Sequence, residues 1–204
     1  KDAKHGRGLF LLQAVKAEAA TLAADVALAS LSPAEAAALI ASGVRLRVYG
    51  FTRYKSKKPD ARPLREVNLL TADAGGARRR FAALEAVAEG VHLARDLVNE
   101  PPNILHPVAF AARLKPLAKL GLKLTILTPA QMKRLGMNAL LGVAQGSAHE
   151  ARLAILEWRG GKAGEAPLAF IGKGVTFDTG GISIKPAQGM EDMKGDMGGA
   201  ACVA

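Results

Sequence analysis

Hydrophobic residues in the first part of the chain recur mostly at helical spacing. Residues 9–30 are rich in Ala and Leu and predict an amphipathic helix. A second helix is predicted to begin at Ser32, a capping residue that is followed by Pro33 at the first helical position, and to be ended by Gly43. Residues 45–51 fit either a short strand or an extension of this helix.

The next part of the chain predicts a loop, a strand and a long helix. Residues 55–65 combine two prolines with many charges and predict a loop. A short strand is predicted over 67–71 and a turn over 73–76. Apolar residues then recur every three or four positions over 77–97, which predicts an amphipathic helix, and Pro101 stops it.

Beyond a domain boundary that we predict near residue 95, short helices alternate with short strands. One helix is predicted over 108–120, with a kink or early end at Pro116, and another from Thr128 to Gly136. Strands are predicted over 123–127, 139–145, 152–157 and 168–171. The last is wholly apolar, as is typical of a strand inside a sheet that is covered on both faces. Strands that alternate with helices predict an α/β fold.

Composition and cysteine content lead us to expect a globular, cytoplasmic protein. Half of the 204 residues are hydrophobic, 23% are charged, and no run of about 18 apolar residues indicates a membrane span. The single cysteine, Cys202, cannot form an internal disulfide, which fits a reducing compartment. The net charge is +10, and basic residues concentrate over 53–65 and 78–80. They could attract nucleic acid, although a solvated loop and an exposed helix start account for them more simply.

The residue types that can carry chemistry gather in the glycine-rich stretch 172–201. It follows the apolar strand prediction, and open α/β sheets place their sites beyond the carboxyl ends of strands. Asp178 and Asp196 offer the oxygen ligands that hard divalent cations require. Two carboxylates rarely complete a metal shell, and acids this far apart are more often separate surface groups. The spacing alone therefore leaves both interpretations open.

Lys173 directly follows the predicted strand, so we expect its amine to be partly buried. A buried amine loses its proton more readily, and a neutral amine can bind a metal, whereas a charged amine can stabilise an oxyanion. The alternative is a lysine that extends to the solvent. A phosphate-binding loop is excluded, because Gly174 stands where Ser or Thr is needed and Pro167 where a glycine is needed.

Three segments resemble one family, the leucyl (cytosol) aminopeptidases, which are two-metal metallopeptidases. They are GKGVTFDTGGISIKP with MKGDMGGAA at 172–201, ARDLVNEPPNILHPVAFA at 94–111 and, more weakly, GFTRYKSKK at 50–58. The resemblance covers the chain from about residue 45 to its end. It implies a mixed-sheet α/β catalytic domain, of which 96–204 form the first part, preceded over 1–95 by the C-terminal part of a smaller α/β N-terminal domain and a linker helix.

The resemblance also implies an activity and a set of site residues. The family releases N-terminal amino acids from peptides, preferably leucine and other apolar residues, by attack of a metal-bridged hydroxide. It uses two divalent ions, Mn or Zn, with Mg as a possibility. The matching metal ligands are Lys173, Asp178 and Asp196, with Asp178 bridging the ions. Lys185 would be catalytic, steadying the charge of the tetrahedral intermediate, and Met193 would line the pocket for the first side chain. Lys185, Asp178 and Asp196 would also contact the substrate.

The resemblance further implies an oligomeric state and a missing segment of the catalytic domain. The family forms cytoplasmic homohexamers, and we expect no membrane association. A later family segment, Asn-Thr-Asp-Ala-Glu-Gly-Arg, supplies the remaining metal ligands and is absent here. We therefore expect a fragment that lacks the C-terminal catalytic third and is inactive alone. The alternatives are a DNA-binding accessory or regulatory protein on an aminopeptidase scaffold, and a catalytically dead homologue.

Overall fold

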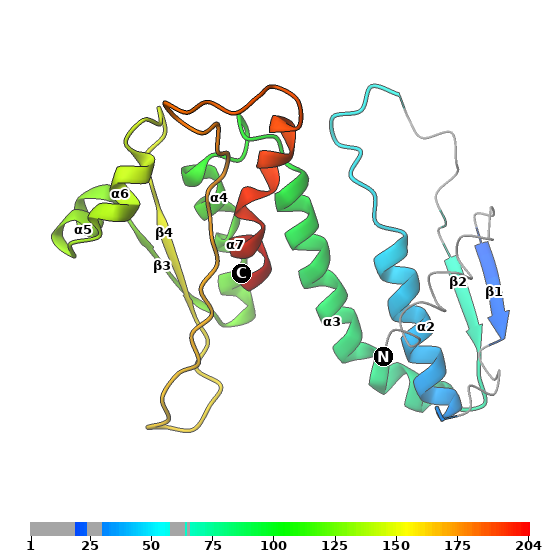
Figure 1. The fold of residues 1–204 in the computed structure, drawn as a ribbon. Helices are drawn as coiled ribbons and strands as arrows, with labels where there is room; N and C mark the ends of the chain where they lie inside the picture. Colours follow the sequence, from blue (N-terminus) through cyan, green and yellow to red (C-terminus); the bar gives the residue numbers. More distant parts are fainter. Residues whose placement is uncertain (1–18, 24–29, 58–63, 65) are drawn as a thin grey trace. The chain divides into compact units, whose positions relative to one another are not determined.

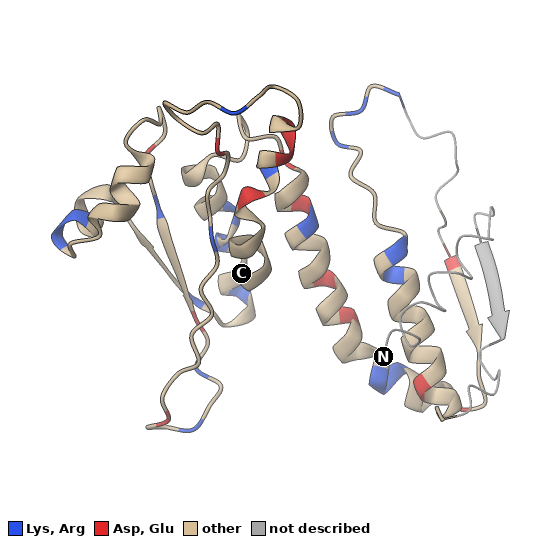
Figure 2. Ribbon diagram, viewed as in Figure 1, with Lys and Arg blue, Asp and Glu red and all other residues tan. Residues whose placement is uncertain are grey.

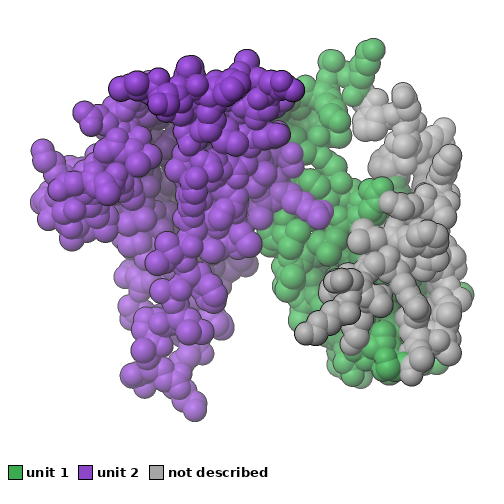
Figure 3. All heavy atoms as spheres, viewed as in Figure 1, with its two compact units in different colours: residues 1–93 green, residues 94–204 purple. Residues whose placement is uncertain are grey.

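The computed structural model describes residues 19–23, 30–57, 64 and 66–204 (Figure 1). These residues form helices and two small sheets, which confirms the α/β class. The chain divides into two compact units, residues 1–93 and 94–204 (Figure 3). In the described ranges no helix is both long and apolar enough to cross a membrane.

The sheet of the first unit pairs two strands that lie far apart in the sequence. Strand β1, Ala19–Ala23, runs parallel to β2, Glu66–Leu70, with Ala19 opposite Glu66. The strand predicted over 67–71 is thus confirmed. The helix predicted over 9–30 is wrong at 19–23, because pairing with β2 overrides the local helical preference of Ala and Leu. The rest of that prediction lies outside the described residues.

Helix α2, Pro33–Arg47, begins where the sequence predicted but ends later. The Ser32 hydroxyl accepts a hydrogen bond from the Glu35 backbone N–H at 3.3 Å, as expected of an N-cap. The predicted end at Gly43 is wrong, since Gly43 is buried inside the helix. Packing therefore outweighs the cost of about 1 kcal/mol that a glycine imposes on a helix interior. The undecided segment 45–51 begins as helix, up to Arg47.

Helix α3, Ala74–Asn99, confirms the longest helix prediction and extends it at both ends. The Asp73 carboxylate accepts a hydrogen bond from the Gly76 backbone N–H at 2.7 Å, so the predicted turn at 73–76 is a helix cap and first turn instead. Ala77 packs with Ala34 and Ala37 of α2 in a small buried cluster. These short side chains let α2 and the start of α3 approach closely.

In the second unit, the end of α3 is followed by a short α-helix that gives way to a 3-10 helix. Helix α4, Pro107–Arg113, gives way to the 3-10 helix η1, Lys115–Leu120, which contains Pro116. The early end predicted at Pro116 is confirmed, because proline has no N–H for an α-helical bond. Gly121 closes η1 with a φ of 90°, a left-handed conformation that glycine adopts without steric cost.

An antiparallel sheet and two short helices follow. Strand β3, Lys123–Leu127, pairs with β4, Leu153–Glu157, and both strand predictions are confirmed. Between them lie α5, Pro129–Arg134, capped by Thr128, and α6, Asn138–Ala144. The strand predicted over 139–145 is wrong, since an apolar run this short fits a helix as well as a strand.

The apolar segment 168–171 does not form the buried strand that the sequence predicted. It pairs with no strand in the described part of the chain. The exposed fractions of Leu168, Phe170 and Ile171 are 88%, 77% and 94%. The prediction of a buried central strand is therefore wrong for this structure, because burial needs a neighbouring strand and covering helices, which local sequence does not provide.

Two polar contacts connect the segment 94–111 to later parts of the second unit. Glu100, which directly follows α3, is 1% exposed, and its carboxylate accepts a hydrogen bond from the Arg113 guanidinium at 2.8 Å. The rings of His106 and His149 stack with centroids 3.9 Å apart. Burial, and to a smaller extent the neighbouring His149, lowers the pKa of His106 below its usual value. The first contact connects the residue after α3 to the end of α4, and the second connects the residue before α4 to His149.

Candidate functional site

The glycine-rich stretch 172–201 brings its candidate residues together as two ion pairs. The Lys173 amine lies 2.6 Å from the Asp196 carboxylate, and the Lys185 amine lies 2.9 Å from the Asp178 carboxylate. Residues 172–189 are mostly irregular backbone, and they lead into the 3-10 helix η2, Met190–Met197, and the short helix α7, Gly198–Val203 (Figure 1). Acidic residues of η2 stand out in Figure 2.

A tight loop holds Lys185 against Asp178. The chain turns through Gly180 and Gly181, whose φ angles of 94° and 66° favour glycine. The backbone N–H of Gly180 donates to the Asp178 carboxylate at 2.8 Å, and that of Lys185 donates to the Thr179 carbonyl at 2.9 Å. The Lys185 amine also donates to the Asp178 backbone carbonyl at 3.0 Å. The loop therefore fixes the amine at two acceptors of one residue.

Asp178 lies in a positive environment. The hydrogen bond from the Lys185 amine, followed by that from the Gly180 N–H, lowers the pKa of Asp178 below its usual value. The charge of Lys173 lowers it further by a smaller amount. Both lysines thus act on the same carboxylate, which stays ionised and available as an oxygen ligand at neutral pH.

Asp196 has one carboxylate oxygen without a partner. Its side chain is 18% exposed, and Oδ2 is buried without a hydrogen bond in the described residues, while Oδ1 faces Lys173. A buried acceptor left unpaired costs about 1–3 kcal/mol, so a ligand that binds this oxygen would be favoured. Met197, the last residue of η2, is 0% exposed, and Ala201 of α7 is 3% exposed. These two buried residues anchor the backbone that follows Asp196.

The carboxylates of Asp178 and Asp196 supply part of a site for a divalent cation. Carboxylate oxygens from Asp178 and Asp196 suit hard cations such as Mn²⁺, and Oδ2 of Asp196 is buried without a hydrogen bond in the described residues. In the described ranges, however, no three His, Cys, Asp or Glu side chains cluster closely enough to hold a metal. A complete shell would need ligands beyond these two acids, such as the Lys173 amine, water or later residues.

One expectation about Lys173 is wrong. Its side chain is 58% exposed rather than partly buried, because the segment before it is not covered by a sheet. Met193 lies half-buried in η2, and its role in substrate binding stays a prediction. The two ion pairs were not predicted from the sequence. The Gly180-Gly181 turn was the available signal, since it reverses the chain and returns residue 185 to residue 178.

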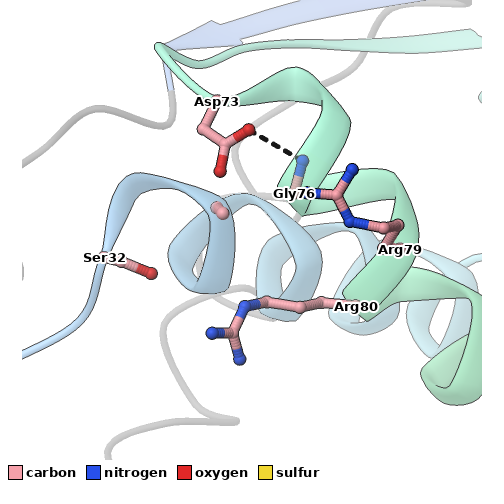
Figure 4. Close-up of a pocket in the computed structure, with 6 residues that line it drawn as sticks. Ser32, Asp73, Gly76, Arg79 and Arg80 are labelled. Atoms are coloured by element: carbon pink, nitrogen blue, oxygen red, sulfur yellow. Dashed lines mark hydrogen bonds between the residues drawn. The ribbon is translucent and has the colours of Figure 1, made fainter.

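A hollow in the first unit lies away from these residues. It has a volume of about 480 Å³ and is lined by Ser32, Ala34, Asp73, Gly76, Arg79 and Arg80 (Figure 4). None of these residues belongs to 172–201. We locate the candidate site by its paired acids and amines rather than by this hollow, since the hollow has one carboxylate that already accepts a hydrogen bond from Gly76.

The fold and these residues define a family. Residues 92–204 match the model of the cytosol aminopeptidase family, catalytic domain. That match covers more than half of the chain, and the chain therefore belongs to the cytosol aminopeptidase family.

Relatives of known sequence agree with this assignment. The chain is 62% identical over 174 residues to a probable cytosol aminopeptidase of Rhizobium etli (strain CIAT 652), covering 83% of this chain and 35% of the relative. It is 56% identical over 188 residues to one of Rhodopseudomonas palustris (strain BisA53), covering 91% of this chain and 38% of the relative. The chain thus spans about a third of the length of these relatives.

Solved structures show the same fold. The bottromycin maturation enzyme BotP in complex with Mn superposes with a TM-score of 0.75 at 37% identity, over 97% of this chain and 41% of BotP. A mutant of tomato leucine aminopeptidase superposes with a TM-score of 0.79 at 30% identity, over 97% of this chain and 39% of the tomato chain.

Proposed function

We propose that the full-length protein is a metal-dependent aminopeptidase that releases N-terminal amino acids, preferably leucine and other apolar residues. The observation that carries this proposal is the pairing of Lys173 with Asp196 and of Lys185 with Asp178, with one buried oxygen of Asp196 left unpaired. Family membership and the Mn complex of BotP support a divalent metal. By the same resemblance we propose two ions per subunit, Mn or Zn, and a cytoplasmic homohexamer that acts on peptides.

The proposed mechanism assigns each side chain a separate task. Lys173, Asp178 and Asp196 would hold the metal, and bound divalent ions would supply an activated water and polarise the scissile carbonyl. Two acceptors of Asp178 hold the Lys185 amine, which has three N–H donors. The third donor is left to face the substrate oxygen on which negative charge develops. Met193 would contact the first side chain of the substrate.

Hydrolysis of leucine amide tests this function. The full-length protein should release leucine when Mn²⁺ is present and lose that activity when a chelator removes the metal, because the two acids alone cannot activate water. Residues 1–204 alone should show no turnover, since the described residues supply only part of a metal shell. Turnover by the full-length protein that resists the chelator would contradict the metal dependence. Metal-dependent turnover by residues 1–204 would contradict the expected inactivity of this part alone.

A second candidate function, nucleic acid binding, rests on the basic residues of the first unit. Residues 78–80 are three exposed arginines in the first turns of α3, where the helix dipole disfavours cations (Figure 2). In the described part of the chain none of the three forms an ion pair with an acid. Lys55 and Lys57 are exposed as well, and Lys58 lies outside the described residues.

Duplex DNA at low salt tests this candidate. If the basic run binds phosphates, replacing Lys55, Lys57 and Lys58 by Gln should weaken DNA binding. The slope of the logarithm of the binding constant against the logarithm of the salt concentration should fall by up to about three. The replacement should leave leucine amide hydrolysis unchanged, because these residues lie outside 172–201. Absence of DNA binding at low salt, or binding that the three substitutions do not alter, excludes this role.

A further inference from the structure

Two glycines make a close backbone contact behind the candidate site. A Cβ atom added to Gly172 would lie 2.5 Å from the carbonyl carbon of Gly199 and 2.6 Å from Cα of Ala200. A Cβ atom added to Gly199 would lie 3.0 Å from the backbone nitrogen of Lys173. The atoms that would be struck belong to the backbone, so no side-chain rotation can relieve the contact. At residue 172 only glycine permits this approach, whereas a Cβ at residue 199 would require the neighbouring backbone to move by a few tenths of an ångström.

The contact joins the segment that carries Lys173 to the helix that follows Asp196. The backbone N–H of Ala200 donates to the Lys173 carbonyl at 2.9 Å, which connects the two segments beside the glycines. The helix side of the contact is held in place, because Met197 is 0% exposed and Ala201 is 3% exposed. The position of Lys173 relative to Asp196 therefore depends on how closely residue 172 approaches residue 199.

We propose that Gly172 and Gly199 are positioning residues: their contact sets the Lys173 amine against the Asp196 carboxylate and so determines the metal affinity of the position that these two side chains share. This inference rests on the proposed function. A Cβ at residue 172 would force a backbone shift of roughly 1 Å, and misplacements of that size in a site cost about 10²-fold. Changes in groups that orient metal ligands lower metal affinity by about 10- to 100-fold.

Gly174 offers a matched control within the same segment. It flanks Lys173 on the opposite side from Gly172, and a Cβ added there would meet Ala200 Cβ at 3.4 Å, an ordinary van der Waals distance. Its φ is not positive, so alanine fits its backbone. Gly174→Ala thus adds the same methyl group next to the same lysine without closing on the backbone of Gly199.

The experiment compares Mn²⁺ binding by the full-length protein and its Gly172→Ala, Gly199→Ala and Gly174→Ala variants. Each protein is stripped with chelator and titrated with Mn²⁺, and free Mn²⁺ is followed by its electron paramagnetic resonance signal. We expect at least about tenfold weaker binding in Gly172→Ala, a smaller loss in Gly199→Ala, and binding within about twofold of wild type in Gly174→Ala.

A second measurement needs no metal. Hydrogen exchange of the Ala200 amide should be faster in metal-free Gly172→Ala than in wild type, because its hydrogen bond to Lys173 is broken, and should stay slow in Gly174→Ala. If Gly172→Ala does not fold, Gly199→Ala, whose contact is milder, decides by the same two measurements.

The outcomes separate the inference from the proposed function. Mn²⁺ affinity and Ala200 exchange that match wild type in Gly172→Ala overturn the inference and leave the aminopeptidase proposal standing. Equal losses in Gly172→Ala and Gly174→Ala also overturn it, since they would show that any added methyl group disturbs the segment. If the wild-type protein itself neither binds Mn²⁺ nor hydrolyses leucine amide, the proposed function fails first, and the role in metal affinity fails with it.

Discussion

Lys185→Ala is expected to lower kcat/KM for leucine amide by about 10²- to 10³-fold in the full-length protein. The structure places this amine on the Asp178 carboxylate and backbone carbonyl, at 2.9 Å and 3.0 Å, and so leaves one donor for the substrate. Removing a preorganised cation from a developing oxyanion typically costs about 3–4 kcal/mol in the barrier. Steady-state kinetics with added Mn²⁺ measure the effect.

The assignment of Lys185 to the oxyanion also requires that the metal content stay nearly unchanged. Metal analysis of the purified variant tests this, because Asp178 would lose its partner and could bind metal differently. Lys194→Ala is the matched control, since Lys194 lies in the same glycine-rich stretch and has no role in the proposed mechanism. Unchanged turnover in Lys185→Ala would show that Lys185 does not stabilise the oxyanion. A loss of metal that parallels the loss of turnover would show that Lys185 acts by orienting Asp178 as a metal ligand.

Features of the fold that depend on neighbouring residues were predictable from the sequence. The Ser32 cap, the helix start at Thr128 and the early helix end at Pro116 each follow from residues within a few positions. Features that depend on distant residues were not predictable. Strand β1 exists through its pairing with β2, and the segment 168–171 stays exposed because no described strand lies beside it.

The candidate site shows the same division. The sequence pointed to Lys173, Asp178, Lys185 and Asp196 through a family resemblance, and the structure brings them together as two pairs. Which lysine meets which acid could not be read from spacing. It depends on the left-handed turn at Gly180 and Gly181 and on the 3-10 helix η2, for which hydrophobic periodicity gives no signal. The exposure of Lys173 likewise depends on tertiary covering, not on its neighbours.

Arg113→Ala is expected to destabilise the protein by roughly 3 kcal/mol, because it removes the Arg113 guanidinium from the buried Glu100 carboxylate. The Glu100 side chain is 0% exposed and that of Arg113 is 32% exposed, with 2.8 Å between them. The pair connects the residue after α3 to the end of α4, so its loss should loosen the whole segment 94–111. Urea denaturation and thermal melting of the full-length protein measure the change.

Two comparisons decide whether burial is the cause. The double variant Glu100→Gln with Arg113→Ala should be more stable than Arg113→Ala alone, since a buried neutral amide is less costly than a buried carboxylate that has lost the Arg113 guanidinium. Lys123→Ala removes one partner of an exposed pair with Glu157, whose side chains are 65% and 32% exposed, and should cost at most about 1 kcal/mol. If Arg113→Ala were no more destabilising than Lys123→Ala, the buried ion pair would not be what holds α3 and α4 together. The apolar contacts of Leu97 and Leu105, which are 1% and 2% exposed, would then have to supply that stability.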